Sequence, residues 1–223
     1  SDEHSLGACI GRYAGRISLG GFKIEDEFYP IHTDNGVHLH GGKVGFGKKY
    51  WTLTEEHKGN NPFLKLSYKS KDLEEGYPGN LEVSVTYKLK GNSLQIFHEA
   101  KTDKTTIVNL TNHSYFKLDD ETSIDHYNLE LKSEGLLEVD ERLLPTGIIK
   151  DVQNTPNDFL TTKKIGQVRL DTPFLFKPHC NNAATVSSEV TGIVMKVTTN
   201  QPAIVIYTPT SFPGICFETQ NYP

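Results

Sequence analysis

The sequence predicts an all-β fold, an antiparallel sandwich or barrel, on three observations. Short alternations of apolar and polar residues recur along the 223-residue chain, and a period of two is typical of half-buried strands. Glycine, proline and asparagine separate these runs at the spacing of hairpins. Helix signals are scarce, and only 158–165 is expected to form a short helix. A chain of this length can bury one good-sized core, so we expect one domain over residues 1–223.

The clearest elements are two strands at 81–89 and 94–100. Apolar residues fall on every second position of 81–89, the same alternation resumes in 94–100, and Lys90-Gly91-Asn92-Ser93 lies between them. This pattern predicts a β-hairpin with one packed face and one solvated face. We expect further strands at 8–13, 50–56, 63–67, 105–110, 127–133, 192–199, 203–208 and 215–219.

Composition and charge narrow the classes of partner and compartment. The formal charge is −5 and lysine and arginine are not clustered, whereas nucleic-acid binding requires a basic stripe. No apolar run is long enough to span a membrane, and from the residues after Ser1 we expect no signal peptide. Cys9, Cys180 and Cys216 are far apart and odd in number, which argues against a disulfide framework. We therefore expect a cytoplasmic protein with neither a nucleic-acid nor a membrane partner.

The central stretch, Val108 to Leu118, holds the first candidate catalytic residue. It reads VNLTNHSYFKL, a strand that runs into a polar corner and out into another strand. His113 lies at that corner, between amide and hydroxyl neighbours and just before two aromatic residues. A histidine held in this way exchanges a proton readily near neutral pH. A structural histidine at a strand end is the alternative interpretation, and this stretch alone does not separate the two.

Three further charged residues do not fit a plain core. Glu218 lies in 215–220, a strand otherwise suited to burial, and a buried carboxylate costs free energy unless it is paired. It is a candidate proton acceptor, with an outward-facing glutamate or a structural ion pair as the alternatives. Arg16 is able to form a salt bridge or to hold a sugar hydroxyl. Asp171 precedes an apolar strand, and it is either a binding residue or the start of a turn before Pro173.

His38 and His40 suggest a metal site as an alternative. On a strand their imidazoles would face the same side, as in cupin-type sites. Such a site also needs a nearby carboxylate, and the following GGKVGFGKK contains no acidic residue. We therefore expect no metal, with one of these histidines structural and the other functional. The same glycine-rich segment lacks the Lys-Ser/Thr ending of a phosphate loop.

Six segments resemble one known family. They are GRYAGRI, HLHGGKVGFGKKYW, EEGYPGNL, NLTNHSYFKL, LLPTGII and CFETQNYP. Their order and spacing are similar to those of aldose 1-epimerases (galactose mutarotases), from near residue 7 to the last residue. The resemblance implies a large antiparallel β-sandwich, the galactose mutarotase-like supersandwich, with the sugar in an open cleft across one sheet. The first family strands, the C-terminal segment and parts of two loops are not matched, so we expect a single domain that lacks them.

The resemblance also implies an isomerase that interconverts the α and β anomers of free galactose or glucose, without a metal or another cofactor. His113 would be the general acid and Glu218 the general base. Arg16 and His40 would bind the sugar, and Asp171 would match a sugar-binding aspartate less closely. We expect His113 and Glu218 to lie on opposite edges of one hexose, with room for the pyranose between them.

Three departures from the family pattern bear on the sugar contacts, and two alternatives to a stand-alone mutarotase stay open. The family asparagine before the arginine is Gly15 here, the Asp-His-Asn element is Asp171-Thr172-Pro173, and the sugar-binding glutamine is Val205. With fewer sugar contacts, a non-catalytic carbohydrate-binding sandwich of the same family is one alternative. The mutarotase half of a fused UDP-galactose 4-epimerase enzyme is the other.

Overall fold

The computed structural model describes residues 4–176 and 182–222, so Cys180 lies outside the described residues. They form two compact units, an N-terminal unit of residues 8–112 and a C-terminal unit of residues 4–7 and 113–222. Among the described residues, every regular element is a β-strand except two 3-10 turns, η1 (Phe46–Lys48) and η2 (Glu74–Gly76). The predicted all-β fold is therefore confirmed, whereas the single domain over 1–223 stays a prediction.

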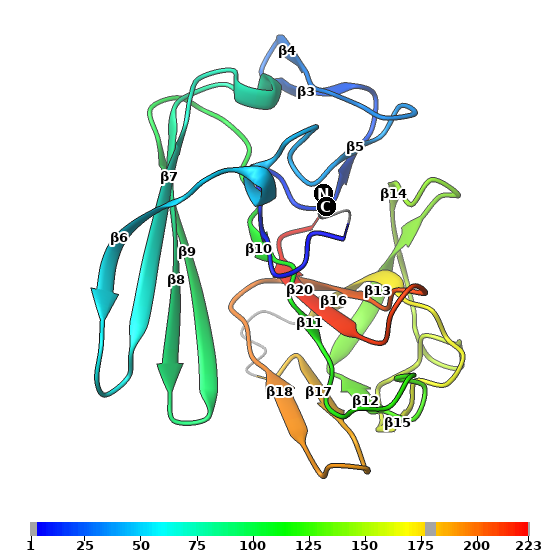
Figure 1. Cartoon of the computed structure of the whole chain (residues 1–223). Coiled ribbons are helices and arrows are strands. Elements are labelled where there is room, and N and C mark those ends of the chain that lie inside the picture. Colours follow the sequence, from blue (N-terminus) through cyan, green and yellow to red (C-terminus); the bar gives the residue numbers. More distant parts are fainter. Residues whose placement is uncertain (1–3, 177–181, 223) are drawn as a thin grey trace. The chain divides into compact units, whose positions relative to one another are not determined.

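The main sheet of the N-terminal unit has four antiparallel strands in the order β6-β7-β8-β9 (Figure 1). Strands β8 and β9 pair continuously, so the predicted hairpin is confirmed. Leu81 and Val83 of β8 form a small buried core with Phe46. The bounds are β6 (Thr52–His57), β7 (Phe63–Ser70), β8 (Leu81–Lys90) and β9 (Ser93–Thr102).

This unit also contains three two-stranded sheets, which pair β1 with β10, β2 with β5, and β3 with β4. The strand predicted at 105–110 is wrong, because the backbone of Asn109 bonds to the loop at Arg12 and Ala14 as a single bridge instead of a ladder. The bounds are β1 (Cys9–Ile10), β2 (Arg16–Ile17), β3 (Gly21–Ile24), β4 (Glu27–Pro30), β5 (His38–Leu39) and β10 (Thr111–Asn112).

The C-terminal unit is a sandwich of two sheets, one in the order β11-β20-β19-β16-β13-β14 and one in the order β15-β12-β17-β18 (Figure 1). Side chains from both sheets share one core, with Leu129 and Val186 from the smaller sheet and Phe174, Ile204 and Phe217 from the larger. The bounds are β11 (Tyr115–Phe116), β12 (Asn128–Leu131), β13 (Ser133–Val139), β14 (Pro145–Lys150), β15 (Lys163–Lys164), β16 (Asp171–Phe176), β17 (Ala184–Ser187), β18 (Val194–Val197), β19 (Ala203–Tyr207) and β20 (Ile215–Gln220).

The helix predicted at 158–165 is wrong, because the segment is an irregular turn that ends in β15. The Asp158 carboxylate accepts hydrogen bonds from the backbone N–H groups of Asn154 at 2.9 Å and Leu160 at 3.2 Å. Such side-chain bonds close local turns and compete with the helical hydrogen-bond pattern. Phe159 and Ile165 are nevertheless buried, so apolar side chains of this segment reach the core without a helix.

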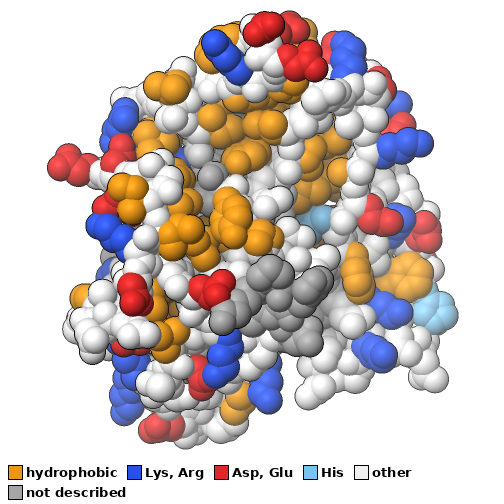
Figure 2. Space-filling model, turned by 180° about the vertical axis from the view of Figure 1, so that it is seen from behind, with side chains coloured by type: hydrophobic (Ala, Val, Ile, Leu, Met, Phe, Trp, Pro, Cys, Tyr) orange, Lys and Arg blue, Asp and Glu red, His pale blue; other side chains and the backbone are white. Residues whose placement is uncertain are grey.

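Charges of both signs are interspersed on the face of the molecule drawn in Figure 2. Figure 2 shows acidic and basic side chains mixed over one face, with apolar patches between them. Within the described part of the chain, no helix is long and apolar enough to cross a membrane.

His98 makes the stability of the protein depend on pH. Its Nε2 is buried with no hydrogen-bond partner among the described residues. Burial lowers the pKa of His98 to about 4 from an ordinary value of 6.5. As pH falls below 6.5 the unfolded chain takes up this proton first, so the free energy of unfolding is highest above that pH and declines toward pH 4. The decline over the window is expected to be roughly 3 kcal/mol.

The substitution His98→Phe removes this titration. Between pH 7 and pH 5, the free energy of unfolding of the variant is expected to fall by about 2 kcal/mol less than that of the wild type. Urea denaturation at the two pH values measures the difference, and His57→Phe is the control because His57 is an exposed residue of β6. Equal pH slopes for wild type and His98→Phe would contradict the assignment.

Candidate active site

Strand β20 presents Glu218 on the face of its sheet that is turned away from the core. Ile215 and Phe217 belong to the core of the C-terminal unit. Because side chains of a strand alternate between faces, Cys216 and Glu218 point to the opposite side. Glu218 is only 3% exposed, so the predicted burial of this carboxylate is confirmed.

The register of the sheet places Asp171 and Tyr207 on the same face as Glu218. Asp171 pairs with Tyr207, which pairs with Cys216, while Val205 pairs with Glu218. Residues aligned across neighbouring strands share a face, and so do residues two apart on one strand. Asp171 is the first residue of β16, so it begins a strand instead of opening a turn.

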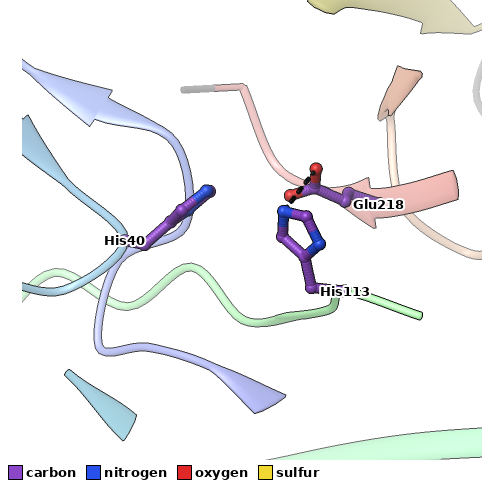
Figure 3. A group of neighbouring side chains, drawn as sticks. All are labelled: His40, His113 and Glu218. Carbon is purple, nitrogen blue, oxygen red and sulfur yellow. Dashed lines mark ion pairs between the residues drawn. The ribbon is translucent and has the colours of Figure 1, made fainter. Parts of the chain in front are cut away.

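His113 lies next to Glu218, with its Nε2 3.4 Å from the Glu218 Oε1 and the two side chains 7% and 4% exposed. Figure 3 shows the imidazole and the carboxylate pointing toward each other. The histidine lies between β10 and β11, and its ring packs on Tyr115 with 5.1 Å between ring centroids. An imidazolium and a carboxylate in this arrangement form an ion pair between a proton donor and a proton acceptor.

The expectation of a pyranose between His113 and Glu218 is wrong, because 3.4 Å between their nearest atoms leaves no room for a sugar ring. The reason is the pairing of β11 with β20, in which Tyr115 lies opposite Cys216. Tyr115 is two positions after His113, and Cys216 is two positions before Glu218. Neighbouring strands are about 4.8 Å apart, so the pairing brings the two side chains into contact.

Cys216 is a neighbour of His113 that the sequence did not single out. Its Sγ lies 3.6 Å from the His113 Nδ1. Burial, together with the charge of Glu218, raises the pKa of the Cys216 thiol, so a neutral thiol faces the second ring nitrogen. Alternation along 215–220 already placed this cysteine on the side of Glu218, but its contact with His113 depends on strand pairing.

In the N-terminal unit, Arg16 and His40 lie on paired segments, since Arg16 of β2 pairs with Leu39 of β5. The His40 backbone N–H donates to the Gly15 carbonyl at 3.1 Å, and the Gly15 N–H donates to the His40 Nδ1 at 3.3 Å. Because Nδ1 accepts this bond, the proton of the neutral ring lies on Nε2. In this tautomer the Nε2–H of His40 is a hydrogen-bond donor.

His38 is the structural member of the two histidines. It is fully buried, with Nδ1 2.7 Å from the His32 carbonyl oxygen and Nε2 2.5 Å from the Tyr77 hydroxyl. A carbonyl only accepts, so Nδ1 carries the proton and Nε2 accepts from Tyr77. Burial lowers the pKa of His38 and keeps the ring neutral. His40 follows the end of β5 at a φ of 50°, so the two rings do not form the strand pair of a cupin-type site.

Known proteins resemble this chain over most of its length. The family model described as aldose 1-epimerase matches residues 1–223. The galactose mutarotase of Sus scrofa is 37% identical over 98% of this chain and 70% of its own length. The aldose 1-epimerase of Haemophilus influenzae is 36% identical over 98% of this chain and 72% of its own length.

The chain belongs to the aldose 1-epimerase family.

The crystal structure of a galactose 1-epimerase from Lactobacillus acidophilus agrees with this family. Its TM-score is 0.90 at 31% identity, and the match covers 99% of this chain and 73% of that one. The predicted family is confirmed, and its enzymes are isomerases that act on free aldose sugars.

Two of the departures from the aldose 1-epimerase pattern lie on the Glu218 face. Val205 pairs with Glu218, and Pro173 pairs with Val205. Thr172 alternates to the opposite face, so its replacement of the family histidine does not alter the surroundings of Glu218. Gly15 holds His40 through backbone atoms alone, so this contact does not need the family asparagine side chain.

Arg12, in the same GRYAGRI segment as Arg16, is a structural residue that the sequence did not distinguish. It is 1% exposed, and its guanidinium donates to the Lys71 carbonyl at 2.8 Å, the Pro78 carbonyl at 3.0 Å and the Ser70 carbonyl at 3.1 Å. It also donates to the Ser70 hydroxyl at 3.0 Å. These bonds tie the turn before β8 to the loop that leads to Arg16.

The substitution Arg12→Lys keeps the charge but loses the planar fork of donors. It is expected to lower the free energy of unfolding by about 3 kcal/mol, because buried carbonyl groups are left without donors. Urea denaturation measures this loss. The control is Arg142→Lys, whose side chain is 60% exposed and whose effect should stay within about 0.5 kcal/mol. A denaturation midpoint unchanged by Arg12→Lys would refute this role.

Proposed function

We propose that this protein interconverts the α and β anomers of free aldohexoses, galactose and glucose among them, by acid/base opening and closure of the ring. The contact of the His113 Nε2 with the Glu218 Oε1 at 3.4 Å supports this proposal best. In a pyranose, the ring oxygen and the anomeric hydroxyl are bonded to the same carbon, C1. An acid for the first and a base for the second must therefore both reach atoms bonded to one carbon, which two neighbouring side chains such as His113 and Glu218 can do.

The reaction starts with Glu218 ionised and His113 protonated, the state in which they form an ion pair. Glu218 takes the proton of the C1 hydroxyl while His113 donates its Nε2 proton to the ring oxygen O5. The C1–O5 bond breaks, and the electrons of the former O–H bond complete the C1 carbonyl. After rotation about C1–C2, the O5 hydroxyl attacks the other face of the aldehyde. Glu218 then returns a proton to O1, and His113 regains one from O5.

The remaining predicted site residues would hold the sugar for this exchange. His40 offers its Nε2–H donor, Arg16 offers a planar fork of donors, and Asp171 accepts hydrogen bonds on the Glu218 face. Such contacts contribute to rate by fixing the C1 substituents in reach of the acid and the base. The relative from Sus scrofa is named a galactose mutarotase, which supports galactose as a substrate.

A cytoplasmic location is proposed from cysteine chemistry. Cys9 and Cys216 are buried free thiols, and burial raises the pKa of Cys9 to about 12. Thiols kept reduced are typical of the cytosol.

The substitutions His113→Asn and Glu218→Gln test the catalytic assignment. Each removes one proton-transfer group and is expected to lower kcat by roughly 10²–10⁴-fold. Polarimetry of freshly dissolved α-D-galactose follows the approach to anomeric equilibrium. Glu141→Gln is the control, because Glu141 is an exposed residue of the same unit, and it should keep wild-type activity.

Two outcomes of this assay would contradict catalysis. Wild-type protein that leaves the uncatalysed drift unchanged but binds galactose in calorimetry would establish the non-catalytic sugar-binding alternative. Full activity in either His113→Asn or Glu218→Gln would remove that residue from the mechanism.

The rate of mutarotation is expected to follow a bell-shaped pH profile. It falls at acid pH when Glu218 becomes protonated and can no longer accept a proton, and at alkaline pH when His113 has lost the proton it must donate. In Glu218→Gln the residual rate should lose the acid limb and keep the alkaline limb. A wild-type profile that is flat from mildly acidic to alkaline pH would count against this pair.

A further inference from the structure

The turn formed by residues 71–80, which contains all but the last residue of the EEGYPGNL segment, has no role in the chemistry described so far. Its backbone is unusual, with positive φ angles of 63° at Leu73, 53° at Glu75 and 92° at Gly76. A non-glycine residue in this region costs free energy and persists where its surroundings hold it. The contacts of Glu75 show what holds it.

The Glu75 carboxylate accepts hydrogen bonds from the loop that follows His40. Its Oε2 accepts the backbone N–H of Lys43 and its Oε1 accepts that of Val44, each at 3.0 Å. Two successive N–H groups aimed at one carboxylate form a bidentate, charge-assisted contact. One side chain thus fixes the path of two consecutive peptide groups.

The loop between His40 and Lys43 can follow this path only because its two residues carry no side chains. A Cβ on Gly42 would lie 2.3 Å from the Glu75 Oε2, and one on Gly41 would lie 1.8 Å from the Gly11 carbonyl oxygen. Both glycines also have positive φ, 84° at Gly41 and 118° at Gly42, which glycine adopts without strain. The two glycines therefore let the loop approach the Glu75 carboxylate closely.

His40 itself is held from both sides. Before it, Gly15 bonds to its backbone N–H and to its Nδ1. After it, the loop is held by Glu75 at Lys43 and Val44. Since His40 has a φ of 50°, a change in the loop would rotate its Cα–Cβ bond and redirect the Nε2–H.

The neighbouring Glu74 contacts a different set of residues. Its carboxylate accepts from the Ser70 hydroxyl at 2.6 Å and from the Tyr68 hydroxyl at 2.8 Å, and it pairs with Lys49. These partners belong to the sheet and to the surroundings of Arg12, which bonds the same Ser70. Glu74 therefore holds the sheet, whereas Glu75 holds the loop that follows His40.

We infer that Glu75 is a positioning residue for sugar binding: by holding the Lys43 and Val44 N–H groups it orients His40 toward the sugar. This inference rests on the proposed function, in which His40 binds the substrate. It assigns the EEGYPGNL segment to the support of the His40 loop, with Tyr77 holding His38 and Glu75 holding the residues after His40.

The test compares Glu75→Gly with Glu25→Gly. Both replace a glutamate of positive φ, 53° at Glu75 and 54° at Glu25, by the residue best suited to that backbone. Glu25 is exposed in the turn between β3 and β4, so it controls for the backbone change. Glu75→Gly is expected to raise KM for galactose about tenfold with kcat within about twofold, and Glu25→Gly to change neither. Glu75→Gln keeps one acceptor oxygen and should give an intermediate KM.

A double-mutant cycle with His40→Ala separates positioning from a general loss of structure. If Glu75 acts through His40, Glu75→Gly should raise KM by less than about twofold when His40 is already alanine. A full tenfold effect in that background, or an unchanged KM in Glu75→Gly alone, would overturn the inference.

Amide hydrogen exchange tests the contact without relying on activity. In Glu75→Gly the Lys43 and Val44 amides are expected to exchange about tenfold faster than in wild type, and in Glu25→Gly at the wild-type rate. Unchanged exchange in Glu75→Gly would disprove the contact. Wild-type protein without mutarotase activity would instead remove the proposed function, while the exchange result would still decide whether Glu75 holds the loop.

Discussion

The position of Glu218 depends on the pleat of β20. Phe217 points into the core and Glu218 points to the other face, so a shift of one residue would bury the carboxylate among apolar side chains and take the Phe217 ring out of the core. Both neighbours of β20 oppose such a shift, β19 through the pairing of Val205 with Glu218 and β11 through the pairing of Tyr115 with Cys216. The register that is required for a packed core is thus also the register that brings together His113 and Glu218, the proposed acid and base.

The N-terminal unit positions its share of the predicted site by different means. Arg16 and His40 lie at the ends of two-residue strands, which are too short to hold a side chain by sheet packing alone. Backbone hydrogen bonds from Gly15 and the carboxylate of Glu75 supply the missing constraint. Arg12, in the same segment as Arg16, donates hydrogen bonds to several carbonyl groups of the turn before β8. The positive φ angles of His40 and Glu75 are therefore held by these polar contacts.

Mutarotation requires two proton-transfer groups and a bound sugar, and the proposed site supplies the two groups from His113 and Glu218. His113 and Glu218 lie in direct contact, which suits two oxygens bonded to one carbon better than opposite edges of a hexose would. The second nitrogen of His113 faces a neutral thiol, since burial and the charge of Glu218 raise the pKa of Cys216. A neutral thiol is a weak hydrogen-bonding partner. It contacts the ring without adding a second charge.

The sequence by itself determined the all-β class, the hairpin of 81–100 and the residue types of the candidate site, because alternation, turn residues and short motifs are local properties. It did not determine that His113 and Glu218 are in contact, nor that Arg12 is the buried arginine of its segment. Those features arise from strand pairings and carbonyl groups distant in the sequence. The helix expected at 158–165 failed for a local reason, because the Asp158 carboxylate accepts nearby backbone N–H groups in place of the helical pattern. Burial in the core stabilises apolar residues whatever their local backbone.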